Sequence, residues 1–188
     1  RDRAAMTLFR KDIRTLESGA AALLPPARQA RIRRCRDADE ALRLTAAGLL
    51  LRERLGVTQD GQLRTGPYGK PYLPGGPEFS VSHGGELAVL LLADAPCGVD
   101  VEPCGREAPA AMRQRVLTAA ELASGRPFAW LWTRKEAVLK LDGRGITLPL
   151  PALSVLDDEL TWNGQHIALT TECWQEHFIS CAEIQNDA

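Results

Sequence analysis

Two acidic segments constrain the fold of this 188-residue chain more than any other feature. In residues 98–102 (GVDVE) polar and apolar side chains alternate, as in a β-strand, so the two carboxylates share one face. Further on, Trp132, Glu136 and Lys140 recur at every fourth position, which places them on one stripe of an α-helix. If this strand and helix pack together, the carboxylates can converge on a hard cation such as Mg²⁺. Mg²⁺ takes oxygen ligands and often shares them with substrate phosphates, which the lysine would also meet.

Both segments also have an ordinary structural explanation. The alternating acids fit the solvent face of an edge strand, because alternation is the normal pattern of a half-buried strand. Glu136 and Lys140 fit a helix-surface ion pair, which contributes only about 0.3–0.5 kcal/mol. Taken alone, each segment leaves these interpretations open, and only the two segments together favour a site.

The remaining pattern favours an α+β fold, because each half of the chain combines helices with a small antiparallel sheet. The helices are expected at residues 27–35, 39–55, 109–117, 118–123 and 127–142. The strands are expected at residues 6–10, 79–83, 86–93, 98–102, 153–156, 160–162, 166–171 and 177–184. Gly84-Gly85 and Asn163-Gly164 predict hairpin turns.

Charge divides the chain near residue 95. Residues 1–95 carry 15 Lys and Arg against 11 Asp and Glu, a balance of +4, whereas residues 96–188 carry 8 against 13, a balance of −5. This asymmetry predicts that one half meets anions and the other holds a cation. A total charge of −1 and an aromatic content of 5% argue against nucleic-acid binding.

The five cysteines and three histidines predict neither a zinc site nor a disulfide framework, because no Cys-x-x-Cys pair occurs. Reduced thiols are typical of the cytosol. The longest apolar run, residues 87–93, is too short to span a bilayer, and no signal peptide is visible. We therefore expect a cytoplasmic protein without a membrane anchor.

Four segments carry a family resemblance when they are taken in order: residues 69–74 (GKPYLP), 79–84 (FSVSHG), 98–102 (GVDVE) and 132–145 (WTRKEAVLKLDGRG). Together they resemble the Sfp-type 4′-phosphopantetheinyl transferases of the W-KEA subgroup. The resemblance implies two similar α+β subdomains packed as a pseudo-dimer with the active site in the cleft between them. Residues 1–95 would bind the nucleotide of coenzyme A, and residues 96–188 would carry Mg²⁺ and the catalytic residues.

The resemblance also implies roles for the acidic segments. Asp100, Glu102 and Glu136 match the three metal-binding acids of the family. Glu136 is in addition a candidate base for the incoming serine, an alternative to a metal-bound water. Lys140 matches a catalytic lysine that contacts the coenzyme A diphosphate, and Lys135 matches the family lysine just before Glu136.

At the nucleotide end, the resemblance implies binding of the 3′-phosphate by basic side chains and adenine packing by the glycine-proline loop. The matching residues are Arg28, Arg31, Arg43, Ser82 and His83 for the phosphate, and Gly69, Lys70 and Pro71 for the loop. The alternatives are a solvated basic helix, a structural histidine and an ordinary turn. This chain also departs from the family at two places, with Ser80 for asparagine and Gly84 for a second serine.

The activity implied is transfer of the phosphopantetheine arm of coenzyme A to a serine of an apo acyl, peptidyl or aryl carrier protein, with release of adenosine 3′,5′-bisphosphate. Because both halves lie in one chain, we expect a monomer. Two alternatives remain at this point, a Mg²⁺-dependent phosphohydrolase and a non-catalytic coenzyme A-binding module. The sequence does not identify the carrier protein or the pathway.

Overall fold

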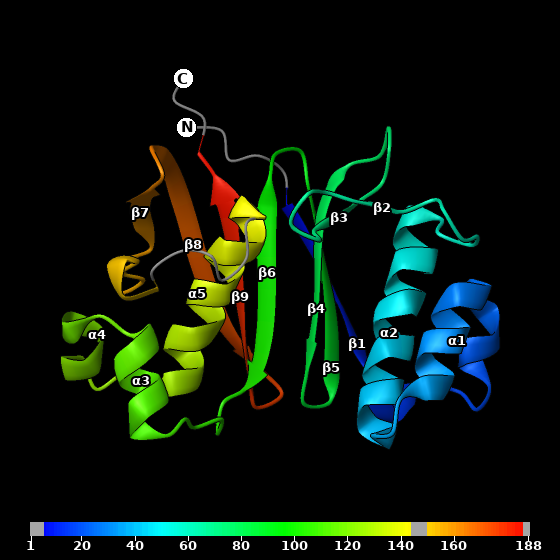
Figure 1. Ribbon diagram of the computed structural model, residues 1–188, viewed down its shortest axis with the longest axis horizontal. Coiled ribbons are helices and arrows are strands. Elements are labelled where there is room, and N and C mark those ends of the chain that lie inside the picture. Colours follow the sequence, from blue (N-terminus) through cyan, green and yellow to red (C-terminus); the bar gives the residue numbers. More distant parts are fainter. Residues whose placement is uncertain (1–5, 144–149, 186–188) are drawn as a thin grey trace.

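The computed structural model describes residues 6–143 and 150–185. The layers run from α1 (Pro26–Arg34) and α2 (Ala38–Leu55) through a three-stranded and then a four-stranded sheet to α5 (Phe128–Asp142) on the far side (Figure 1). All strand pairs described are antiparallel. The predicted α+β class is therefore confirmed. Arg144 and Gly145, the last residues of the fourth sequence motif, lie outside the described residues.

The first sheet has the order β1-β5-β4, and its strands are Met6–Asp12, Leu87–Ala93 and Glu78–Gly84 in that order. The outer face is covered by α2 (Ala38–Leu55), with α1 (Pro26–Arg34) beside it. Helix α2 begins at Asp37, whose side chain accepts a hydrogen bond from the backbone N–H of Glu40. It ends at Gly56 in the left-handed conformation, as the sequence predicted.

Strand β5 is buried on both faces. Ala88 and Leu90 pack toward α2, whereas Leu87, Val89 and Leu91 pack against the second sheet. A strand between two layers needs apolar side chains on both faces, in contrast to the alternation of a half-exposed strand. This position explains the continuous apolar run at residues 87–93.

The second sheet has the order β6-β9-β8-β7, and its strands are Cys97–Pro103, His177–Ile184, Gln165–Trp174 and Glu159–Trp162 in that order. Helix α5 (Phe128–Asp142) lies on β6 and β9, and α3 (Ala110–Val116) and α4 (Ala119–Ala123) lie on the same side. A Cβ atom at Gly98 would lie 1.9 Å from the carbonyl oxygen of Ala137. Glycine at this position therefore lets α5 lie directly on the backbone of β6.

The two halves repeat one topology. In each half the first strand pairs with the last, β1 with β5 and β6 with β9, and helices connect the first strand to the closing hairpin. This repetition agrees with the expected pair of similar α+β units. The division of tasks between residues 1–95 and 96–188 stays a prediction.

One predicted strand is wrong, because residues 153–156 do not pair with any described strand. The carbonyl of Leu153 accepts a hydrogen bond from Lys135, and the carbonyl of Val155 accepts one from Arg134. The N–H of Val155 donates to a buried glutamate carboxylate. Buried charged side chains thus bind the backbone groups that a sheet would have used.

The glycine- and proline-rich loop contains a short hairpin that the sequence did not predict. It consists of β2 (Arg64–Thr65) and β3 (Pro71–Tyr72). The hairpin turns through Gly69, whose φ of 88° favours glycine. Among all the helices described, none combines the length and apolar character needed to cross a bilayer.

Candidate active site

The candidate site lies where β4 of the first sheet meets β6 of the second. The hydroxyl of Ser80 accepts a hydrogen bond from the backbone N–H of Val99 at 3.0 Å. Two residues further along, the hydroxyl of Ser82 donates to Oδ1 of Asp100 at 2.8 Å. These bonds join the halves of the chain and bring the FSVSHG and GVDVE segments face to face.

Both departures from the family pattern have a place in this junction. Ser80, which replaces asparagine, is buried and supplies the bond to Val99. Gly84, which replaces a second serine, lies against β6, and a Cβ atom there would meet the carbonyl oxygen of Val101 at 2.4 Å. The backbone of β6 leaves no room for a side chain at this position.

Lys140 links helix α5 to strand β6. Its Nζ lies 2.6 Å from Oδ1 of Asp100 and 2.7 Å from the hydroxyl of Ser82. Asp100 is buried, and its second oxygen, Oδ2, has no hydrogen-bond partner among the described residues. The carboxylate thus keeps one oxygen available for a further ligand.

Glu136 projects from α5 one turn before Lys140, as the helical spacing predicted. Its Oε1 is buried and, within the described part of the chain, has no hydrogen-bond partner. Burial raises the pKa of the Glu136 carboxyl, and the nearby charge of Asp100 raises it further, whereas Lys140 and Arg106 act in the opposite direction. A carboxyl with a raised pKa can accept a proton near neutral pH more easily than an ordinary glutamate.

Glu102 differs from Asp100 and Glu136, because within the described residues it has no buried carboxylate oxygen without a hydrogen-bond partner. Its Oε1 forms an ion pair with Nη1 of Arg106, four residues further on. Among residues 6–143 and 150–185, no three His, Cys, Asp or Glu side chains are arranged to hold a metal ion. The expected three-acid cluster is therefore not formed in this structure, since Lys140 and Arg106 each hold one of the acids.

Two of the three acids nevertheless suit a magnesium ion. Asp100 and Glu136 each keep a buried carboxylate oxygen that no group in residues 6–143 or 150–185 hydrogen-bonds, and Mg²⁺ prefers donors of this type. Mg²⁺ commonly takes one or two protein carboxylates and completes its shell with waters and substrate phosphates. The donor set fits a two-carboxylate site more closely than the three-carboxylate site expected from the sequence.

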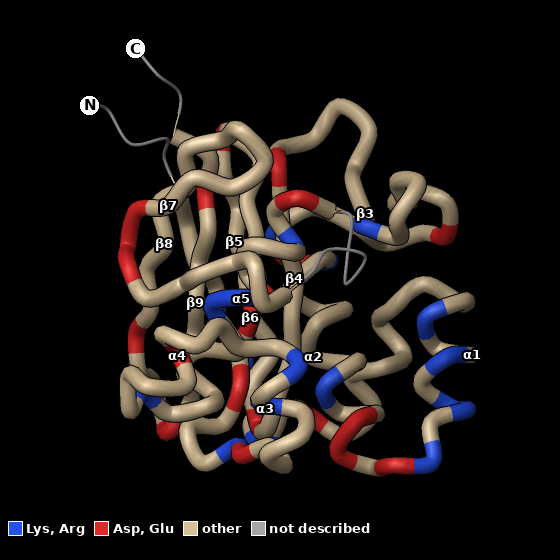
Figure 2. Tube along the Cα trace, turned by 60° about the vertical axis from the view of Figure 1, so that its left-hand side comes forward, with Lys and Arg blue, Asp and Glu red and all other residues tan. Residues whose placement is uncertain are grey.

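A cavity of about 520 Å³ extends from Asp100 toward α1. Arg28, Arg31, Ser82 and His83 line it together with Asp100 and Lys140, so the structure brings these predicted residues together. Figure 2 shows that Lys and Arg positions recur along α1. Burial lowers the pKa of the Arg28 guanidinium, and the neighbouring charge of Arg31 adds to the effect. An anion would relieve this crowding of positive charge.

Arg43 does not line this cavity, and its guanidinium is hydrogen-bonded to other groups of the protein. Its Nε donates to Oε2 of Glu40 at 2.9 Å, and its Nη1 donates to the carbonyl of Gly85 at 3.2 Å. The same oxygen of Glu40 lies 3.8 Å from Nδ1 of His83. Burial lowers the pKa of His83, Lys140, Arg43 and Arg31 lower it further, and Glu40 opposes the change.

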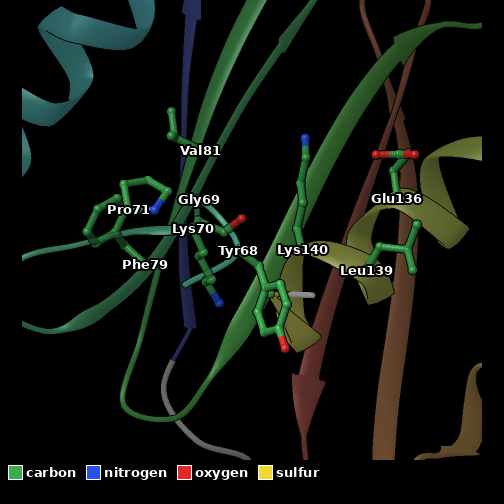
Figure 3. Close-up of a pocket in the computed structure, with 11 residues that line it drawn as sticks. Tyr68, Gly69, Lys70, Pro71, Phe79, Val81, Glu136, Leu139 and Lys140 are labelled. Atoms are coloured by element: carbon green, nitrogen blue, oxygen red, sulfur yellow. The ribbon is translucent and has the colours of Figure 1, made fainter. Parts of the chain in front are cut away.

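The Gly69-Lys70-Pro71 loop lines a second cavity of about 240 Å³, which reaches Glu136 and Lys140 (Figure 3). Tyr68 and Phe79 supply aromatic walls. Nζ of Lys70 donates to the carbonyls of Cys97, at 2.9 Å, and Leu141, at 3.3 Å. Lys70 therefore attaches this loop to the start of β6 and the end of α5.

The structure does not bring Lys135 to the cleft, which is at odds with the expected catalytic role. Its Nζ lies 2.8 Å from Oε2 of Glu121, and neither side chain is exposed. The ammonium also donates to the carbonyls of Leu150 and Leu153. Helix geometry explains the difference, because neighbouring positions point in different directions, Glu136 to the cleft and Lys135 to the core.

Comparison with known proteins finds similarity to one family in the second half of the chain. Residues 96–183 match the family model of the 4′-phosphopantetheinyl transferase superfamily. A protein named 4′-phosphopantetheinyl transferase from Bacillus subtilis is 33% identical over 99 residues, which cover 47% of this chain and 44% of that protein. The 4′-phosphopantetheinyl transferase Sfp of Bacillus subtilis strain 168 is 27% identical over 147 residues, which cover 70% and 66%.

A third relative, 4′-phosphopantetheinyl transferase psf-1 of Bacillus pumilus, is 33% identical over 108 residues, which cover 52% of this chain and 45% of that protein. The chain thus spans between 44% and 66% of the length of these relatives. The resemblance to the Sfp-type enzymes, first drawn from four short segments, is confirmed by these matches.

Proposed function

We propose that this chain, whose residues 96–183 match the family model of the 4′-phosphopantetheinyl transferase superfamily, moves the phosphopantetheine arm of coenzyme A to a serine of an apo carrier protein. The observation that carries the proposal concerns two buried carboxylate oxygens, on Asp100 and Glu136, that have no hydrogen-bond partner among the described residues and lie beside the ammonium of Lys140. Metal ligands and a fixed cation next to a basic cavity suit chemistry on a diphosphate.

In this proposal the serine hydroxyl of the carrier attacks the β-phosphorus of coenzyme A. A new bond forms between serine oxygen and phosphorus, the bond to the bridging oxygen breaks, and adenosine 3′,5′-bisphosphate leaves. Glu136, whose pKa is raised by burial, takes the serine proton. Lys140 stabilises negative charge on the phosphate oxygens.

Asp100 and Glu136 would hold Mg²⁺, which when bound polarises the diphosphate and neutralises the leaving group. Ser82 and Lys140 hold the Asp100 carboxylate through their bonds to Oδ1, which would leave Oδ2 for the metal ion. Glu102 would join this set only after leaving Arg106.

For the nucleotide, we assign the 3′-phosphate to the cavity lined by Arg28, Arg31 and His83. Arginine suits this task because its planar fork gives parallel, charge-assisted hydrogen bonds to phosphate oxygens. We assign the adenine to the smaller cavity beside Tyr68 and Pro71. Arg43 supports the phosphate pocket through Glu40 and does not line it.

The division into residues 1–95 for the nucleotide and 96–188 for metal and catalysis belongs to the same proposal. So do a monomeric state and a cytosolic location. The cross-half bonds of Ser80 and Ser82 support a monomer, because they build the cleft within one chain. Sedimentation at assay concentration, combined with activity, tests this assignment, and activity confined to an oligomer would contradict it.

Intact-mass measurement of candidate apo carrier proteins tests the function. Each carrier is incubated with coenzyme A, Mg²⁺ and the protein, and the mass should rise by one phosphopantetheine group. Asp100→Asn should lose this transfer, whereas Asp157→Asn, in a loop far along the chain, should keep it. Free phosphopantetheine without a carrier would indicate a phosphohydrolase, and coenzyme A binding without turnover would indicate a binding module.

A further inference from the structure

Arg106 occupies a position among the acids that neither the sequence motifs nor the proposed reaction explains. It follows β6 in a turn, where its backbone N–H donates to the carbonyl of Pro103 at 3.0 Å. Its guanidinium forms the ion pair with Glu102 and lies 5.6 Å from the ring centroid of Trp132. Trp132 precedes Glu136 by one helical turn, so the arginine lies over the face of α5 that carries the candidate metal ligand.

The charges in this region almost balance without any metal. Asp100, Glu102 and Glu136 supply three acids, and Lys140 and Arg106 supply two cations, each paired with a different acid. Glu102 is mostly buried, with 14% of its side chain exposed, so its attraction to the arginine is less screened than that of a surface pair. A divalent cation that approaches this region alone therefore meets an already compensated site.

We propose that Arg106 is a resident counter-ion that keeps Glu102 out of the metal site, so that the chain binds its divalent cation weakly until a diphosphate is present. The proposal rests on the proposed function and concerns a positioning residue of the same site. A bound diphosphate adds negative charge next to Lys140 and offers the guanidinium a second partner of the kind it prefers. Metal and diphosphate would then bind together, and Glu102 would be released as a third ligand.

Mn²⁺ binding in the absence of any substrate tests this inference, with free Mn²⁺ measured by electron paramagnetic resonance. Arg106→Gln should bind Mn²⁺ about tenfold more tightly than the wild type, because it frees Glu102 and removes a nearby positive charge. Arg106→Lys, which keeps the charge, should stay close to the wild type. The double variant Glu102→Gln/Arg106→Gln should lose most of the gain.

Arg113→Gln is the matched control. Arg113 also pairs with a glutamate, Glu107, and lies 6.0 Å from the ring centroid of an aromatic residue, Phe128, but it stands on α3 away from the acids. Its variant should bind Mn²⁺ as the wild type does. Addition of coenzyme A should narrow the difference between wild type and Arg106→Gln.

The outcomes separate this inference from the proposed function. An Arg106→Gln variant that binds Mn²⁺ no better than the wild type overturns the role of Arg106, even if carrier modification proceeds normally. Tighter Mn²⁺ binding without any carrier modification supports the role of Arg106 and contradicts the transferase activity. An equal gain in Arg113→Gln would show a general charge effect and would also overturn the inference.

Discussion

Nζ of Lys135 lies 2.8 Å from Oε2 of Glu121 in the core. The next residue along the chain, Glu136, reaches the cleft with its side chain. These adjacent residues of α5 thus have different roles. Lys135 binds the carbonyls of residues 150 and 153, and Glu121 caps α4 and accepts the N–H of Val155. The buried pair attaches α5 to the segments that pack around it.

Lys135→Met should therefore act on stability. Removing one partner of a buried ion pair leaves an uncompensated charge and costs about 3–5 kcal/mol. We expect this loss in the free energy of unfolding from urea titration, and we expect partial recovery in Glu121→Gln/Lys135→Met, in which no charge remains buried. Full stability together with lost transfer would restore the catalytic interpretation of Lys135.

Glu136→Gln should stabilise the fold and abolish the reaction. The folded state holds a proton on Glu136 more tightly than the unfolded state, so its charge costs stability as pH rises above about 4.3, the ordinary glutamate value. The variant should have a higher Tm than the wild type at pH 7, and kcat should fall about a hundredfold or more. Glu159→Gln, on the exposed start of β7, should change neither quantity.

His83 should make stability depend on pH. Because burial lowers its pKa, the unfolded chain takes up a proton below about pH 6.5 that the folded chain does not yet bind. The free energy of unfolding should fall as pH drops through this window, until the lowered pKa is reached. Urea titrations at pH 7.5 and 5.5 should show a smaller difference for His83→Gln than for the wild type. His166→Gln, at an exposed position of β8, should resemble the wild type.

The basic cavity should distinguish coenzyme A from dephospho-coenzyme A. Hydrogen bonds to charged groups contribute about 1.5–3 kcal/mol, so the 3′-phosphate should improve binding about tenfold to a hundredfold in calorimetry. The double variant Arg31→Ala/His83→Ala should lose most of this preference. Arg33→Ala, at the exposed side of α1, should keep it. A wild type that binds both ligands equally would show that the cavity is misassigned.

Gly84→Ser, which restores the family residue, should destabilise this chain. The new Cβ atom would meet the Val101 carbonyl oxygen at 2.4 Å, and crowding of a packed region typically costs about 1–3 kcal/mol. Thermal unfolding measures the loss. Gly105→Ser is the control, since a Cβ atom there meets nothing within 4 Å. Equal Tm values for the two variants would mean that the backbone of β6 at Val101 moves far enough to accept the new side chain.

Local patterns predicted the elements well, because each is encoded within a few residues. Helix α5 lies between a proline and a glycine, as Pro127 and Gly143 indicated. The Asn163-Gly164 turn has the positive φ values that its residues favour. Residues 153–156 were misjudged for a different reason: their partners are charged side chains from distant positions, which no local period reveals.

The sequence predicted that several candidate residues lie close together, although Lys135 points to the core, and it predicted their pairings less well. Motif spacing identified Asp100, Glu136 and Lys140, which the structure brings together. It gave no signal for the pairing of Glu102 with Arg106, or for Glu40 between Arg43 and His83. Such pairings depend on side chains that meet only after loops and helices have packed.

The pairing of first and last strands in each sheet also predicts an order of folding steps. The ladders described join strands of the same half, β1 with β5 and β6 with β9, across long stretches of chain. Non-local pairing of this kind is slow. The Ser80 and Ser82 bonds can form only when both sheets exist. During refolding, circular dichroism should therefore recover before coenzyme A binding, because the cleft appears only in the final docking step.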